Sequence, residues 1–202
     1  MTLKISEGNS KMGKIASVSL PSVLSCRPGA KCIKNCYARK LENLRPPVRA
    51  AYMHNWEVLN NQPEVFWKEI NAVLALNKFF RFHVSGDIPN MEYFKNMVQA
   101  AINNPECRIL CFTKQYEIVN EYIEDETTPE IPENLRVIFS IWIAQEYSNP
   151  HNLPEAHVKN KAHHWTHRPD AKPCPGNCTD CALAFANCWS LKNGEQVVFD
   201  QH

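Results

Sequence analysis

The 202-residue chain lacks any apolar run that approaches the about eighteen residues needed to span a bilayer. Its first residues, MTLKISEGNSKMGK, also lack the apolar stretch of a secretory signal. We therefore expect a cytoplasmic protein that does not contact a membrane. Because cytoplasmic thiols stay reduced, its nine cysteines are expected to serve metal binding or catalysis and not disulfide formation.

Several familiar site patterns are missing as well. The chain contains no phosphate-binding loop, no nucleophile elbow and no convincing pair of carboxylates at helical spacing. It shows neither an internal repeat nor a low-complexity tract. Its length and its 44% apolar residues fit a single globular domain, in which 1–145 would form the core and 146–202 a Cys/His-rich metal-binding extension.

Charge is distributed unevenly along the chain, although the net charge is only +1. Residues 1–50 carry ten Lys and Arg against Glu7 and Glu42, which is a net +8, so the remainder carries −7. This asymmetry suggests an anionic partner near the N-terminal third. Nucleic acid and an anionic metal cluster both fit, and so does a solvated basic face.

The middle of the chain alternates between strand and helix patterns. We expect strands that include Val18, Phe80–Val84, 107–115 and 134–144, with a short last strand at Gln196–Phe199. Helices are expected over 36–44, over 48–76 with a break near Pro63, over 91–104 with Asn90 as its cap, and over 116–125. The alternation predicts an α/β fold with a parallel sheet, and the chain is too short for an eight-fold barrel, so we expect a partial, open β/α barrel.

Four cysteines lie close together in the polar tail that follows Trp142. Cys174, Cys178, Cys181 and Cys188 have the spacing C-x3-C-x2-C-x6-C. Four such thiolates can hold a tetrahedral zinc or a [4Fe-4S] cluster, and compact runs of cysteine are commoner for the cluster. A zinc site could recruit His163, His164 or His167, whereas unligated cysteines are a third reading.

A second group of cysteines lies in the basic stretch SCRPGAKCIKNCYARK. Cys26, Cys32 and Cys36 have the spacing C-x5-C-x3-C, and three thiolates around a four-iron cluster would leave one iron open to a small molecule. The basic neighbours Arg27, Lys31, Lys34, Arg39 and Lys40 are expected to favour thiolate over thiol. Alternatively, Cys26 packs in the core and only the other two act as ligands. Cys107 and Cys111 read as core residues on one face of a strand, or as extra ligands.

The cysteine triad after the first expected strand, followed by Tyr37, resembles the radical S-adenosylmethionine (SAM) enzymes. Their partial α/β barrel carries a three-cysteine [4Fe-4S] site in that place. The usual spacing there is C-x3-C-x2-C; Cys32 and Cys36 match its first gap, and Cys26 would replace the third cysteine. The segment HVSGD is similar to the glycine-rich motif that contacts SAM, which implies that Ser85, Gly86 and Asp87 bind the cofactor.

The segments GNSKMGKIASVSLP, CYARK and the terminal VVFDQH resemble the bacteriophage family called gene product 88. Together, these resemblances imply an iron-sulfur protein of the host cytoplasm with one or two [4Fe-4S] clusters, SAM as a further cofactor and an electron donor as partner. Its chemistry would be redox or radical SAM chemistry. The alternative is a phage regulatory or nucleic-acid-binding protein, with zinc or a cluster as a structural metal and its basic N-terminal third against the nucleic acid.

Overall fold

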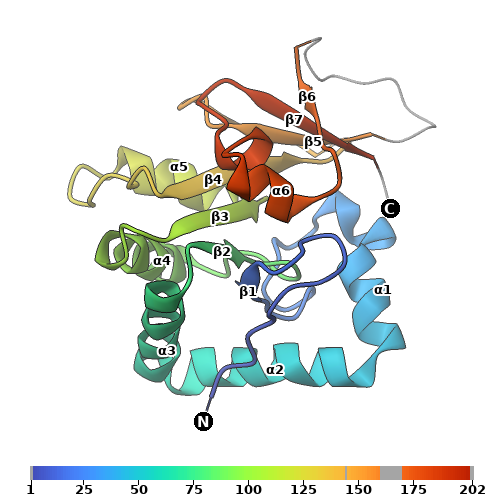
Figure 1. Ribbon diagram of the computed structural model, residues 1–202, viewed down its shortest axis with the longest axis vertical. Coiled ribbons are helices and arrows are strands. Elements are labelled where there is room, and N and C mark those ends of the chain that lie inside the picture. Colours follow the sequence, from blue (N-terminus) through green and yellow to red (C-terminus); the bar gives the residue numbers. More distant parts are fainter. Residues whose placement is uncertain (1, 144, 160–169, 201–202) are drawn as a thin grey trace.

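A sheet of seven parallel strands organises the fold in the computed structural model, which describes residues 2–143, 145–159 and 170–200 (Figure 1). The strands lie in the order β1-β2-β3-β4-β5-β7-β6, and every neighbouring pair is parallel. Their bounds are β1 (Ala16–Val18), β2 (Phe79–Phe82), β3 (Arg108–Thr113), β4 (Leu135–Ile141), β5 (Glu155–Lys159), β6 (Lys172–Pro173) and β7 (Gln196–Asp200). No pairing among the described residues joins β1 to β6, so the sheet is open.

The helices begin where local sequence signals place them. Proline occupies a first position of α2 and of α3, where its missing N–H costs no hydrogen bond, and the Asn90 side chain accepts the backbone N–H of Tyr93 as the cap of α4. The helices are α1 (Tyr37–Leu44), α2 (Pro46–Asn61), α3 (Pro63–Leu76), α4 (Met91–Asn103), α5 (Tyr116–Glu124), α6 (Cys178–Leu183) and the short 3-10 helices η1 (Lys31–Asn35) and η2 (Asn187–Trp189).

Helices α2 to α5 cover one face of the sheet, which we call the helix face (Figure 1). Phe80 and Phe82 of β2 point to this face and are fully buried against residues of α3 and α4. Phe66 and Trp67 of α3 meet edge to face, with their ring centroids 5.2 Å apart. Because side chains alternate along a strand, the residues between these phenylalanines must point to the opposite face.

The opposite face, which we call the tail face, is covered by residues 11–15 and by the tail of the chain. Met12 and Ile15 pack there with Trp189 and Leu191, although they are far apart in sequence. The Thr179 hydroxyl donates to the Met12 carbonyl at 2.8 Å, and the backbone N–H of Cys178 donates to the Lys11 carbonyl at 3.1 Å. These two segments therefore form one layer over the sheet.

Most of the predicted elements are confirmed, and the α/β class with a parallel, open sheet is confirmed with them. One expectation is wrong: the polar pattern between Trp142 and Gln196 predicts no strand, whereas β5 and β6 lie there. Both are short and polar, and they are recruited as neighbours of the apolar β4 and β7. Among the described residues, no helix is both long and apolar enough to cross a membrane.

Asn55 connects three separate segments and gives a test of this architecture. Its amide nitrogen donates to the carbonyls of Lys4 (3.1 Å) and Ser19 (3.0 Å), and its oxygen accepts the N–H of Lys4 at 2.8 Å. The side chain is fully buried. Asn55→Ala is expected to lower the free energy of unfolding by about 1–3 kcal/mol, because it leaves buried backbone groups without partners.

Urea denaturation measures this loss, and Asn60→Ala in the same helix is the matched control. The Asn60 amide donates only to the Trp56 carbonyl on the surface, so its removal should change the unfolding free energy little. Equal losses in both variants would show that Asn55 does not fasten the N-terminal segment.

Candidate metal centre

The cysteine loop leaves the carboxyl end of β1 and is held against the loop that follows β2. The Ser25 hydroxyl donates to the Pro21 carbonyl at 2.8 Å and accepts the backbone N–H of Asp87 at 3.2 Å. Gly86 lies directly below, with a φ of +84°. The residue before Cys26 is therefore fixed by contacts with the β2 loop.

Asp87 joins the loops after β2 and β3. Its carboxylate accepts the Thr113 hydroxyl at 2.6 Å and the backbone N–H groups of Lys114 and Ile88, each at 2.8 Å. Burial raises the pKa of this carboxyl group, although these hydrogen bonds lower it. Lys114 extends to the end of the next strand, where its ammonium group donates to the Ser140 hydroxyl at 2.8 Å. Polar groups from β2, β3 and β4 thus meet at the carboxyl edge of the sheet.

The predicted cofactor-binding residues Ser85, Gly86 and Asp87 all lie at this edge, beneath the cysteine loop. The Ser85 hydroxyl donates to the Glu42 carboxylate at 2.9 Å, and Glu42 also accepts the N–H of Ser22 at 3.0 Å. These contacts position the cysteine loop. The side chains of Ser85 and Asp87 are already hydrogen-bonded to other groups of the protein. Binding of a cofactor by these three residues stays a prediction.

Cys26, Cys32 and Cys36, which we call the N-terminal thiol set, lie near this edge and close enough for their charges to act on one another. All three are partly exposed. Burial raises the pKa of Cys26, and the nearby charges of Asp87, Cys36 and Cys32 raise it further. The basic loop residues are predicted to favour thiolates, but burial has the larger effect and raises the pKa of Cys32. The cation that opposes this rise is Lys114, which lies outside the loop.

Cys174, Cys178, Cys181 and Cys188 come together on the tail face and form the tail thiol set. The N–H of Cys174 donates to the Val198 carbonyl of β7 at 2.8 Å, which fixes the first thiol to the sheet. Burial raises the pKa of Cys188 to about 12, and the charges of the other three thiols contribute to the rise. The Asn187 amide donates to the Cys181 sulfur at 3.3 Å. Burial likewise raises the pKa of Cys178, so Cys178 and Cys188 stay neutral thiols until a metal displaces their protons.

The remaining cysteines and histidines do not join either set. Cys107 and Cys111 are buried in the core on the helix face, as the core reading predicted, and the Cys111 sulfur lies 3.8 Å from Nδ1 of His83. His163, His164 and His167 lie outside the described residues. Within the described part of the chain, no three His, Cys, Asp or Glu side chains are placed to share a single metal ion.

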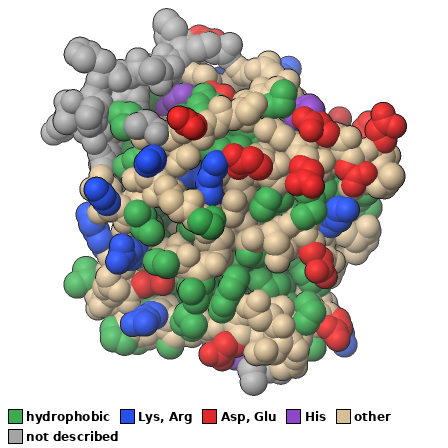
Figure 2. Space-filling model, turned by 180° about the vertical axis from the view of Figure 1, so that it is seen from behind, with side chains coloured by type: hydrophobic (Ala, Val, Ile, Leu, Met, Phe, Trp, Pro, Cys, Tyr) green, Lys and Arg blue, Asp and Glu red, His purple; other side chains and the backbone are tan. Residues whose placement is uncertain are grey.

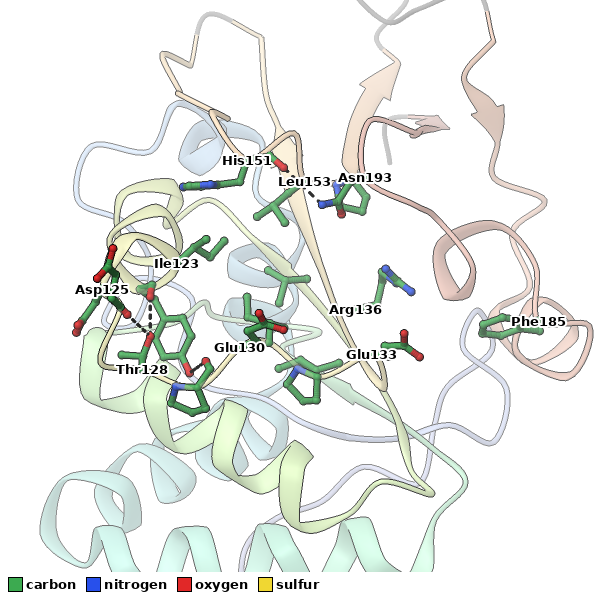
Figure 3. A pocket seen from close by; sticks show the side chains of 18 residues that line it. Ile123, Asp125, Thr128, Glu130, Glu133, Arg136, His151, Leu153, Phe185 and Asn193 are labelled. Carbon is green, nitrogen blue, oxygen red and sulfur yellow. Dashed lines mark hydrogen bonds between the residues drawn. The ribbon is translucent and has the colours of Figure 1, made fainter.

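A hollow of about 830 Å³ lies at the other end of the sheet and was missed by the sequence analysis (Figure 3). Asp125, Glu130 and Glu133 line it together with Arg136 at the start of β4 and His151 before β5. The acidic run from Glu124 to Glu133 is the signal that could have indicated it. None of the nine cysteines lines this hollow, so it is separate from both thiol sets.

Gly86 offers a test of how the cysteine loop is held. A Cβ at this position would lie 2.5 Å from the Ser25 hydroxyl oxygen and 2.8 Å from the Leu20 carbonyl oxygen. Gly86→Ala is therefore expected to lower the free energy of unfolding by about 1–3 kcal/mol more than backbone strain alone.

Gly29→Ala is the matched control for this measurement, because Gly29 also has a positive φ (+72°) but nothing lies within 4 Å of the added Cβ. Denaturant unfolding of both variants separates the contact from the backbone strain. Similar losses in the two would contradict the close packing of the cysteine loop on β2.

The comparisons with known proteins agree with the family resemblance of the sequence. The family profile described as gene product 88 matches residues 2–197. The gene 88 protein of Mycobacterium phage L5 is 26% identical over 218 aligned positions, which cover 95% of this chain and 88% of the relative. The gene 88 protein of Mycobacterium phage D29 is 35% identical over 101 positions, covering 43% and 42% of the two chains. No solved structure matches. Because the profile spans nearly the whole sequence, the chain belongs to the gene product 88 family of bacteriophage proteins.

Proposed function

We propose that the protein is an iron-sulfur protein that holds one cluster at each thiol set. One observation carries the proposal: seven of the nine cysteines, drawn from both ends of the chain, form two local groups, while the other two are core residues. A bound [4Fe-4S] cluster would supply one-electron transfer.

The donor sets fit such clusters in two respects. A cluster is wider than one metal ion, so its thiolates lie further apart than the ligands of a single zinc. The thiols of each set are close enough to raise one another's pKa, although they do not converge on one point. In addition, the backbone N–H of Arg39 lies 3.5 Å from the Cys36 sulfur, and Asn187 donates to Cys181. N–H groups beside ligand sulfurs stabilise their negative charge.

The radical SAM version of the proposal concerns the N-terminal thiol set. Three thiols leave one iron of a [4Fe-4S] cluster without a protein ligand, and this set lies over the carboxyl edge of the sheet, where α/β proteins bind their ligands. The sheet would then be a half-barrel of the radical SAM type. Ser85, Gly86 and Asp87 would position the loop beside SAM, and Lys114 would place a positive charge near it. Reductive cleavage of SAM by the reduced, iron-loaded protein tests this version, and the absence of both binding and cleavage would exclude it.

Metal analysis of protein purified without oxygen tests the proposal itself. We expect brown protein with iron and acid-labile sulfide in near-equal amounts. Cys32→Ala and Cys178→Ala, one from each set, should each lose about half of the iron if each set holds one four-iron cluster. Cys107→Ala is the matched control, because this thiol belongs to the core and its removal should leave the iron content unchanged. A colourless protein that contains zinc would contradict the cluster proposal.

A second candidate function, binding of nucleic acid, is favoured by the surface around α1. Six cations between residues 31 and 49 are exposed: Lys31, Lys34, Arg39, Lys40, Arg45 and Arg49. Viewed from behind, Lys and Arg gather on the side that carries α1, while Asp and Glu gather on the side of α5 (Figure 2). In this version the metal is structural, and the basic surface contacts phosphates.

The salt dependence of DNA binding measures this second candidate. Binding through phosphates should weaken steeply with salt, and Lys31→Gln, Lys34→Gln and Lys40→Gln should each reduce the slope of log K against log [salt] by about 1. Lys95→Gln is the control, because Lys95 lies on α4 beside Asp125. Binding that is absent, or that does not respond to salt, would remove the nucleic-acid reading.

A further inference from the structure

Arg81 is a partly buried cation in the middle of strand β2. It lies in β2 between Phe80 and Phe82, which are fully buried on the helix face, so its own side chain points to the tail face. Phe79 points the same way and stacks edge to face on Trp189, with 5.4 Å between the ring centroids. The Arg81 guanidinium carbon lies 4.8 Å from the centre of the Phe112 ring, on the neighbouring strand.

No anionic partner of Arg81 is present among the described side chains. Its Nε is buried and has no hydrogen-bond partner within residues 2–143, 145–159 and 170–200, and none of their carboxylates lies within 4.0 Å of the guanidinium group. Arg27, by contrast, pairs with Glu117 at 2.7 Å. Arg81 is partly buried, and its Nε loses contact with water without gaining a partner, which costs free energy that the stacking on Phe112 offsets in part.

The groups that face Arg81 are thiols and aromatic side chains. From the tail, Cys178 and Cys188 lie within reach of its charge, which opposes the effect of burial on the pKa of both. From α1, Tyr37 lies within reach as well, and its hydroxyl donates to the Val84 carbonyl. The charge of Arg81 also acts on Cys111 and His83, which lie in β3 and directly after β2. Burial is the main cause, and Arg81 the second, of the fall in the pKa of His83 to about 3. Since this histidine is neutral, the candidates for a counter-charge are the ligand thiols.

We propose that Arg81 is the counter-charge of the cluster at the tail thiol set (the tail centre) and, more weakly, of the cluster at the N-terminal thiol set (the N-terminal centre). Its positive charge would raise the reduction potentials of both centres. This inference rests on the proposed iron-sulfur function. Arg81 would keep its positive charge while a bound centre took one electron from a low-potential one-electron donor, a change that would add one negative charge and make or break no bond. A positive charge nearby favours the reduced state. The effect is larger at the tail thiol set, because the charge of Arg81 acts on Cys178 and Cys188, whereas the cation that acts on Cys26 and Cys32 is Lys114.

Anaerobic redox titration of the iron-loaded protein, followed by electron paramagnetic resonance, tests the proposal with dithionite as reductant. Arg81→Met removes the charge and keeps the apolar stem, so the reduction equilibrium of the tail centre should shift at least tenfold toward the oxidised form, which is about 59 mV for one electron. The N-terminal centre should shift in the same direction by less. Arg81→Lys keeps the charge, so the reduction potentials of both centres in this variant should stay close to those of the unaltered protein.

Two further measurements keep a structural role of Arg81 distinct from an electrostatic one. Arg108→Met is the matched control, since the Arg108 guanidinium carbon also lies over a phenylalanine ring, 3.8 Å from the centre of Phe185, at the opposite end of a strand; its potentials should not move. In metal-free protein the facing thiols are neutral, so Arg81→Met should unfold at an equal or higher temperature than the unaltered chain.

The outcomes separate the two proposals. Unchanged potentials in Arg81→Met, or an equal fall in Arg81→Lys and Arg81→Met, would overturn the role of Arg81 while leaving the clusters in place. Destabilisation of metal-free Arg81→Met would also overturn it, because Arg81 would then have a partner in the absence of metal. Unaltered protein that contains no iron and sulfide would overturn the iron-sulfur proposal, and the role of Arg81 with it.

Discussion

The parallel direction of the strands is the constraint on which the rest of the structure depends. Because β1, β2, β3 and β4 all run the same way, the segments that follow them emerge at one edge of the sheet. The cysteine loop, the Ser85–Asp87 segment, Lys114 and Ser140 meet there for this reason. An antiparallel neighbour would have placed its following loop at the opposite edge, next to the acidic hollow.

A second constraint comes from the layer over the tail face. Residues 11–15 and the cysteine-rich tail form this layer, and hydrogen bonds from Thr179 and Cys178 to residues 12 and 11 tie the two segments together. The tail thiol set is therefore part of the folded body, with Trp189 and Leu191 beneath it in the core. Loss of the contact between the two segments would disperse the thiols as well as expose the sheet.

The charges of the thiols and of Arg81 depend on how deeply the two thiol sets are packed in the fold. Burial raises the pKa of Cys26, Cys32, Cys178 and Cys188, so these groups are neutral thiols in the absence of metal. Arg81 is then a partly buried cation without a carboxylate partner among the described residues. Metal binding would remove protons from the thiols and create negative charge opposite that cation, so folding, metal binding and thiol ionisation are coupled in the proposed function.

The sequence by itself determined the elements whose signals are local. The apolar run of β4, the proline starts of α2 and α3, the Asn90 cap and the grouping of seven cysteines into two short segments can all be read from neighbouring residues. Only the tertiary structure decided that β5 and β6 join the sheet, that Gly86 packs under Ser25, and that Arg81 faces the tail. The reason is that these depend on contacts between distant segments; residues 12 and 179, for instance, meet across 167 positions, and no local pattern encodes such a meeting.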